Sequence, residues 1–167
     1  TLSDTEVFLE YFSHYGLSCI EKMRGMFSAV IYDIENKKIF LIRDRLGMKP
    51  LYYSIKDDFI IFSSEISPLC KSNLLTVEPN YQAISSYLSF RYNYGVGGYI
   101  HSINTLKPGN FFEFSLNIKT EKEYWSIPTF SRINQQKLNE KEIVQKLDEI
   151  LNESIDDHIV SDVPVGS

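Results

Sequence analysis

Two pairs of short apolar runs, each joined by a polar turn, restrict most strongly what this chain can fold into. The first pair occupies residues 26–32 and 39–42, and the second occupies residues 51–54 and 59–62. Apolar runs of this length around turn-forming residues predict antiparallel strand pairs. Because the runs of the first pair are apolar at nearly every position, we expect that hairpin to be buried on both faces.

The segments around these hairpins predict a mixed α+β domain. Ser3 followed by Glu6 is a capping-box pattern, and it predicts a helix that ends near Tyr15. The aromatic content of 14% favours sheet over a helical bundle. Further helices are expected at residues 65–71 and 80–90, and a further strand pair at residues 110–115 and 122–125.

A change in composition and hydrophobic pattern after Trp125 predicts a second domain. Residues 126–139 are polar, and beyond them apolar side chains recur at helical spacing opposite acidic ones. Asn139 with Glu142 resembles a helix N-cap. The apolar stripe of this helix needs a partner surface that the remaining residues cannot supply. We therefore divide the chain into a first domain at 1–128, a linker at 129–138 and the start of a second domain at 139–167.

Charge and composition narrow the classes of function. The net charge is −5 and the basic residues are scattered, so we expect no nucleic-acid partner. No apolar run approaches the roughly 18 residues of a membrane span, and we expect a cytoplasmic protein. Cys19 and Cys70 do not form a disulfide framework or a metal-ligand cluster. The chain begins at Thr1 without an initiator Met, and its last residues up to Ser167 do not resemble a natural C-terminus. We therefore expect it to be an internal piece of a longer protein.

The most charged motif lies between the two hairpins. Arg43, Asp44 and Arg45 end a predicted strand, and Gly47 and Pro50 fix the backbone before the next one. Such a turn could bind an anionic ligand. An ion-pair network that holds the loop is the more common arrangement, with little free energy per pair. The spacing alone does not decide between the two roles.

As a string, residues 43–53 closely resemble the R-D-x-x-G-x-x-P-L-Y-Y signature of class II glutamine amidotransferases of the asparagine synthetase family. Residues 161–166 are similar to its S-D-V-P-x-G element. Five further elements occur in the family's order, similar to its S-D-x-E-V, G-M-F-A-x-x-x-Y-D, A-S-E-x-K, L-x-P-G and Y-W. They lie at residues 3–7, 25–33, 62–66, 106–109 and 124–125.

The resemblance implies a fold and a reaction. It implies an incomplete αββα sandwich of the Ntn-hydrolase type, followed by the first helix of an α/β ATP-pyrophosphatase-type synthetase domain. In this family glutamine is hydrolysed and its ammonia is transferred to an aspartate that ATP and Mg²⁺ have activated as an adenylate. The Asp of S-D-x-E-V binds the α-ammonium of glutamine, and the matching residue is Asp4. We expect Asp4 to face a cleft between the two sheets.

The same resemblance places the catalytic parts outside the chain. It implies that the cysteine nucleophile and the oxyanion-hole residues precede Thr1 and that the ATP loop follows Ser167. We therefore expect no catalytic, cofactor-binding or metal-binding residue here, and no activity from this piece alone. Cys19 and Cys70 are interpreted as buried, unreactive thiols. An N-terminal Thr can act as a nucleophile in related folds, but Thr1 precedes a helix rather than a strand.

Two other functions stay open at this point. The parent protein could transfer ammonia to a different carboxylate, such as a sugar acid or a peptide, because the acceptor pocket lies in the absent domain. The chain could also be a non-catalytic module that keeps the fold, although the intact Asp4 argues against this. A homodimer is common among similar bacterial enzymes and is expected here as one possibility.

Overall fold

The computed structural model describes residues 3–93, 97–129 and 139–159. The chain divides into two compact units, Thr1–Ser126 and Ile127–Ser167. Each unit is described by itself. The predicted linker at 129–138 and the S-D-V-P-x-G element lie almost wholly outside the described residues.

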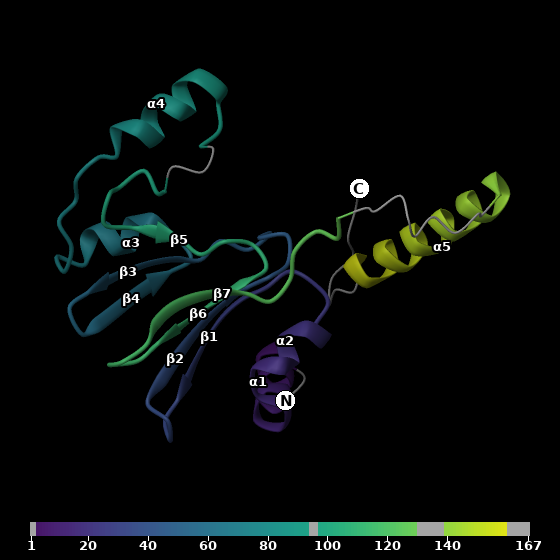
Figure 1. The fold of residues 1–167 in the computed structure, drawn as a ribbon, viewed down its shortest axis with the longest axis horizontal. Coiled ribbons are helices and arrows are strands. Elements are labelled where there is room, and N and C mark those ends of the chain that lie inside the picture. Colours follow the sequence, from purple (N-terminus) through teal and green to yellow (C-terminus); the bar gives the residue numbers. More distant parts are fainter. Residues whose placement is uncertain (1–2, 94–96, 130–138, 160–167) are drawn as a thin grey trace. The chain divides into compact units, whose positions relative to one another are not determined.

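A four-stranded antiparallel sheet forms the centre of the first unit (Figure 1). Its order is β1-β2-β6-β7. The strands are β1 (Ser28–Asp33), β2 (Lys38–Arg43), β6 (Asn110–Phe114) and β7 (Lys119–Glu123). β1 and β2 are the first predicted hairpin, and β6 joins them through a register that pairs Leu41 with Phe112.

A second antiparallel sheet contains the other predicted hairpin. Its order is β4-β3-β5, with β3 (Tyr52–Lys56), β4 (Phe59–Ser63) and the two-residue strand β5 (Asn104–Thr105). One core cluster joins the two sheets, because it contains inward side chains from β2, β3, β4 and β6. Its buried members are Leu41, Leu51, Tyr53, Ile60, Leu106, Phe112 and Phe114.

A helical layer covers the opposite face of the four-stranded sheet. It comprises α1 (Asp4–Tyr15), a 3₁₀ turn (Gly16–Ser18) and α2 (Cys19–Lys22). Alternate residues of β2 and β6 point to this side, as the two-residue period of a strand requires. The buried members of this second cluster are Phe8, Cys19, Ile20, Phe40, Ile42 and Phe111. Figure 1 shows α1 and α2 beside β1 and β2.

Two helices follow β4, as predicted. They are α3 (Ile66–Lys71), which packs against β4, and α4 (Tyr81–Phe90), whose N-cap Asn80 accepts from the Gln82 and Ala83 amides. The first unit therefore belongs to the α+β class with antiparallel sheets. Its classification as an Ntn-type αββα sandwich stays a prediction.

Two details of the sequence prediction were wrong. We expected the first hairpin to be buried on both faces, and only its second strand, β2, is an inner strand of the sheet. The other strand, β1, lies at the edge of the sheet, where Tyr32 is 58% exposed. The last strand occupies 119–123 rather than 122–125. It is the other edge of the sheet, and its charged sequence gives no apolar signal.

The second unit is described through one long helix, α5 (Glu140–Ile159). Its predicted N-cap is confirmed as a reciprocal capping box. The Asn139 side chain accepts from the Glu142 amide at 2.9 Å, and the Glu142 carboxylate accepts from the Asn139 amide at 3.0 Å. The apolar stripe of α5 is about half exposed along its length. Its role as the start of a synthetase domain stays a prediction.

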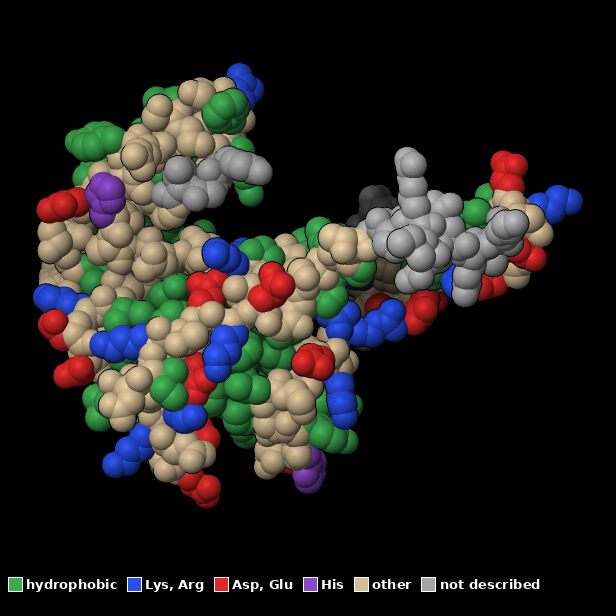
Figure 2. Space-filling view, in the orientation of Figure 1, with side chains coloured by type: hydrophobic (Ala, Val, Ile, Leu, Met, Phe, Trp, Pro, Cys, Tyr) green, Lys and Arg blue, Asp and Glu red, His purple; other side chains and the backbone are tan. Residues whose placement is uncertain are grey.

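Two surface properties follow from the described residues. None of the helices within them is both long enough and apolar enough to cross a membrane. Figure 2 shows acidic and basic side chains interspersed over the visible face of the sheet-containing unit. The ion pairs include Glu113, which receives Lys38 at 2.8 Å and Lys122 at 3.4 Å. These bonds to the lysines, that to Lys38 foremost, lower the pKa of Glu113 below its usual range.

Candidate functional site

Asp4 occupies the first turn of α1, where the N-cap Ser3 begins the helix. Its Oδ1 accepts from the Thr5 amide at 2.7 Å and lies within 3.4 Å of the Ser3 hydroxyl. The side chain is solvent-exposed. A carboxylate at this place is favoured by the free amides and the dipole of the helix start. The local sequence therefore fixes one oxygen of Asp4.

The position of Asp4 differs from the expected one. We expected it to face a cleft between the two sheets, but α1 lies on the side of the four-stranded sheet that is turned away from the three-stranded sheet. The structure thus brings Asp4 to the outer helical layer, with Phe8 of the same helix face buried below it. Its role in binding glutamine stays a prediction.

The segment 43–50, called the Asp44 loop below, is organised by one buried carboxylate. Asp44 is 1% exposed. Its Oδ1 accepts from the Leu46 and Met48 amides at 3.1 and 3.0 Å. Its Oδ2 accepts from the Lys49 amide at 3.0 Å. Three amides that converge on one buried carboxylate satisfy that carboxylate and hold the turn closed.

Arg43 holds the same loop from the other side through main-chain carbonyls. Its Nε donates to the Lys49 carbonyl at 2.9 Å, and its terminal nitrogens donate to the Leu106 and Gly47 carbonyls at 2.6 and 2.7 Å. Burial lowers the pKa of Arg43, and the nearby Asp44 carboxylate opposes this. The ion-pair network, the more common of the two arrangements considered, is not what holds this loop. The loop is held by hydrogen bonds between charged side chains and the backbone.

The Asp44 loop contacts two other family-like segments that are distant in sequence, at residues 106–109 and 124–125. We call the place where the three segments meet the junction. The Asp44 carbonyl accepts from the Gly109 amide at 2.9 Å. The Gly109 carbonyl in turn accepts from the Tyr124 and Trp125 amides at 2.9 and 3.1 Å. The Tyr124 hydroxyl donates to the Arg43 carbonyl at 2.8 Å. Burial, with the Asp44 charge added, raises the pKa of Tyr124 to about 12, so the phenol keeps the proton that it donates.

Two glycines make this convergence possible. Gly47 and Gly109 both have positive φ, at 66° and 65°. A Cβ on Gly109 would lie 2.2 Å from the Trp125 carbonyl oxygen, and one on Gly47 would lie 2.8 Å from Pro108. Both positions combine a left-handed conformation with close packing, which only glycine accommodates without strain. The glycines of the two motifs are therefore structural requirements of the junction.

Arg45 differs from Arg43 in how its guanidinium is used. One terminal nitrogen donates to the Glu21 carbonyl at 2.8 Å, and the guanidinium carbon lies 6.0 Å from the centre of the Trp125 ring. Its Nε is buried and has no hydrogen-bond partner among the described residues. A buried unpaired donor costs about 1–3 kcal/mol. Arg45 links the end of α2 to the last residues of the first unit.

The other sites that the sequence raised are not assembled. Cys19 is fully buried, and burial raises the pKa of its thiol, which disfavours the thiolate. Cys70 is half-buried in α3. Within the described ranges, no group of three or more His, Cys, Asp or Glu could hold a metal ion. Thr1 lies outside the described residues.

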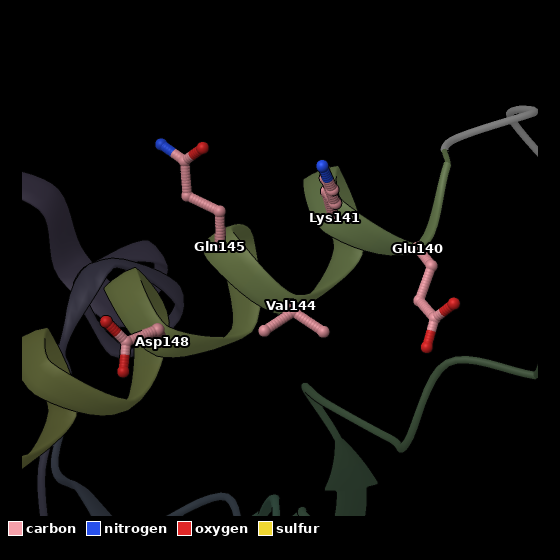
Figure 3. Close-up of a pocket in the computed structure, with 5 residues that line it drawn as sticks. All are labelled: Glu140, Lys141, Val144, Gln145 and Asp148. Atoms are coloured by element: carbon pink, nitrogen blue, oxygen red, sulfur yellow. The ribbon is translucent and has the colours of Figure 1, made fainter.

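A shallow hollow lies on α5. Figure 3 shows that its lining comes from this one helix, with Gln145 and Glu140 pointing in different directions. The full lining is Glu140, Lys141, Val144, Gln145 and Asp148. Side chains that diverge from a single helix do not converge on a ligand, so this hollow is not a candidate site.

Comparison with known proteins decides the family. Residues 1–125 match the family described as a glutamine amidotransferase domain. This range covers the Asp44 loop, Asp4 and all segments that meet at the junction. The chain belongs to the glutamine amidotransferase domain family.

Relatives of this amidotransferase domain are much longer proteins. The chain is 30% identical over 169 residues to asparagine synthetase [glutamine-hydrolyzing] 1 of Bacillus subtilis, covering 100% of the chain and 26% of that protein. It is 28% identical to a putative asparagine synthetase [glutamine-hydrolyzing] 2 of Methanocaldococcus jannaschii, covering 100% of the chain and 32% of that protein. It is 27% identical to amidase chyE of Penicillium rubens, covering 98% of the chain and 24% of that protein. The chain therefore spans about a quarter to a third of these relatives.

The motifs of the amidotransferase domain are recognisable in the sequence, but their contacts are not. The sequence does not predict that the Asp44 carboxylate binds three amides or that Arg45 reaches α2. The available signal was the combination of a buried strand end, an acid and two glycines at turn positions. Such a pattern indicates a carboxylate that closes a loop through backbone amides.

Proposed function

We propose that this chain is the glutamine-binding part of an ATP-dependent asparagine synthetase. That protein would hydrolyse glutamine and transfer the ammonia to an adenylated aspartate. The observation that carries the proposal is the family match over residues 1–125, which includes every segment that meets at the Asp44 loop. The similarity to two glutamine-hydrolysing asparagine synthetases over the whole chain supports the choice of reaction.

Asp4 is the proposed contact for the α-ammonium of glutamine. Its Oδ1 is held by the Thr5 amide, and Oδ2 receives no hydrogen bond among the described residues. A carboxylate oriented in this way offers a charged acceptor to an ammonium group. A hydrogen bond between charged groups contributes about 1.5–3 kcal/mol when water is excluded.

The exposure of Asp4 sets a condition on this proposal. An exposed ion pair contributes only about 0–1 kcal/mol, because water and salt screen it. Useful affinity for glutamine therefore requires a wall that shields the pair. We propose that other parts of the longer protein supply this wall, as the length of the relatives allows.

The proposed reaction also needs ATP, Mg²⁺ and aspartate. The family resemblance implies that ATP, Mg²⁺ and aspartate are held by the ATP-pyrophosphatase-type synthetase domain. We therefore assign no residue of this chain to ATP or Mg²⁺, and no step of adenylation to it. These ligands belong to the proposed synthetase portion of the protein.

A second acceptor remains a specific alternative. One of the similar proteins is named an amidase rather than an asparagine synthetase. Because the amidotransferase domain holds glutamine and not the acceptor, the protein could amidate another carboxylate. Pyrophosphate release in the presence of ATP, measured with aspartate and with a panel of sugar acids and peptides, distinguishes these acceptors.

Replacing Asp4 tests the glutamine site. In the protein that carries this chain, we expect Asp4→Asn to raise the KM for glutamine by about tenfold to a hundredfold, the equivalent of one charged hydrogen bond. Glu10→Gln is the matched control, because it removes an exposed carboxylate from the same helix. An unchanged KM in Asp4→Asn would contradict the role of Asp4. A protein without any glutamine hydrolysis would instead favour a non-catalytic module.

A further inference from the structure

The pair of helices that carries Asp4 is connected to the Asp44 loop at two points. At the first, Arg45 donates to the Glu21 carbonyl at 2.8 Å, in the last turn of α2. Carbonyls in the last turn of a helix have no partner within the helix, and a cation is a suitable donor to them. This bond fixes the end of α2 to the loop.

At the second point the connection runs through an aromatic pair. The Asp44 amide donates to the Phe27 carbonyl at 2.9 Å, and the Phe27 ring meets Phe8 edge-to-face at a centroid distance of 5.6 Å. Phe8 lies four residues after Asp4, so both side chains are on the same face of α1. The orientation of Asp4 on the sheet therefore depends on the loop at both ends of the helix pair.

The environment of Arg45 is not the one expected of a residue selected for stability alone. Its Nε is buried without a hydrogen-bond partner among the described residues, whereas Arg43 in the same loop uses all of its nitrogens. A buried unpaired donor is unfavourable, and such groups in a folded protein call for an explanation. What Arg45 provides in return is the contact with α2.

We propose that Arg45 is a positioning residue: it fixes α2, and through α2 the helix α1, so that the Asp4 carboxylate is held where it receives the α-ammonium of the substrate. This inference rests on the proposed role of Asp4. Arg45 does not touch the substrate and is not a catalytic residue. Its effect is confined to the recognition of the amino-acid end of glutamine.

Kinetics of Arg45 variants in the protein that carries this chain test the inference. We expect Arg45→Gln to raise the KM for glutamine about fivefold or more, as a small misplacement of a binding group does, while kcat changes less than about twofold. Arg45→Lys keeps the charge and part of the reach, so we expect an intermediate KM. Lys49→Gln removes an exposed cation from the same loop, and its KM should stay within about twofold of the parent.

A substrate without the amino group separates positioning from general damage. 4-Carbamoylbutanoate has the amide and the carboxylate of glutamine but no α-ammonium. We expect Arg45→Gln to leave its KM unchanged while that of glutamine rises. Equal losses for both substrates, or a fall in kcat alone, would show a merely structural role and overturn the inference.

A double-mutant cycle with Asp4→Asn completes the test. If Arg45 acts through Asp4, adding Arg45→Gln to Asp4→Asn raises the KM for glutamine no further. Independent, multiplying effects would overturn the positioning role and leave the role of Asp4 intact. An unchanged KM in Asp4→Asn alone would overturn both. Should Arg45→Gln lose its native circular dichroism, the cycle is carried out with Arg45→Lys.

Discussion

Asp44 and Asp4 are carboxylates that both accept hydrogen bonds from backbone amides, but they lie in opposite environments. Asp44 is 1% exposed and binds three backbone amides, whereas Asp4 is exposed and binds the amide of its neighbour Thr5. The more charged and more family-typical motif thus closes a loop, whereas the Asp4 carboxylate stays exposed to solvent. A motif that identifies a family does not have to be the motif that binds the substrate.

Removing the Asp44 carboxylate should have the largest effect on stability. We expect Asp44→Ala to lower the free energy of unfolding by about 3 kcal/mol, because three amides lose a charged acceptor together. Urea unfolding of the chain measures this, and fluorescence of its single tryptophan, Trp125, reports on the junction itself. Asp58→Asn, in an exposed hairpin turn, is the control and should change stability by less than about 0.5 kcal/mol.

Equal stability of the Asp44→Ala and Asp58→Asn proteins would break the comparison between the two carboxylates. Asp44→Asn gives a finer measure, since an amide keeps one acceptor oxygen but presents an NH₂ group to the remaining amides. We expect its unfolding midpoint to fall between those of the parent and Asp44→Ala.

The second-largest effect is expected where the Asp44 loop meets residue 109. Gly109→Ala should lower the free energy of unfolding by about 2–3 kcal/mol, because it adds a clash with the Trp125 carbonyl to the strain of a positive φ. Gly16→Ala is a matched control: its φ is 56°, and a Cβ there meets nothing within 4 Å. Because its ψ is −145°, its backbone lies in a region that essentially only glycine adopts, and the variant should cost only that strain, about 1–3 kcal/mol.

The difference between the Gly109→Ala and Gly16→Ala midpoints measures the packing at the junction separately from backbone strain. Equal midpoints for the two variants would mean that the contact with Trp125 contributes nothing. The comparison of the Asp44 loop with an open surface would then lose one of its supports.

Local patterns in the sequence were sufficient for much of the fold. The hairpin strands, the helices α1, α4 and α5, and the capping box at Asn139 follow from periodicity and turn residues, which act over a few neighbours. The predicted position of β7 was displaced toward the C-terminus, because a charged edge strand has no alternating apolar pattern. The aromatic residues Tyr124 and Trp125 gave a misleading strand signal beside it. β5 has only two residues, so its pairing with β3 comes from tertiary context.

The candidate site was less predictable, for a physical reason. Charged residue types are visible in the sequence, but the directions of backbone amides are not. Asp44 therefore suggested ion pairs, while the folded loop presents three amides to it. For Asp4, the resemblance supplied a role and helix-capping rules supplied a local geometry. Neither the resemblance nor the capping rules determine which face of the sheet α1 covers. Asp4 lies on the outer helical layer and not at the expected cleft between the sheets.

Asp4→Asn should have the smallest effect on stability and thereby sharpen the contrast most. An acid in the first turn of a helix contributes about 0.5 kcal/mol through the helix dipole, and asparagine retains an oxygen that can accept from the Thr5 amide. The unfolding midpoint should therefore move little, although the KM for glutamine is expected to rise at least tenfold. A large loss of stability would instead place Asp4 with Asp44 among the structural carboxylates. A weak effect on folding would support the proposed role of Asp4, because a carboxylate that the fold does not need can keep an oxygen free to bind a ligand.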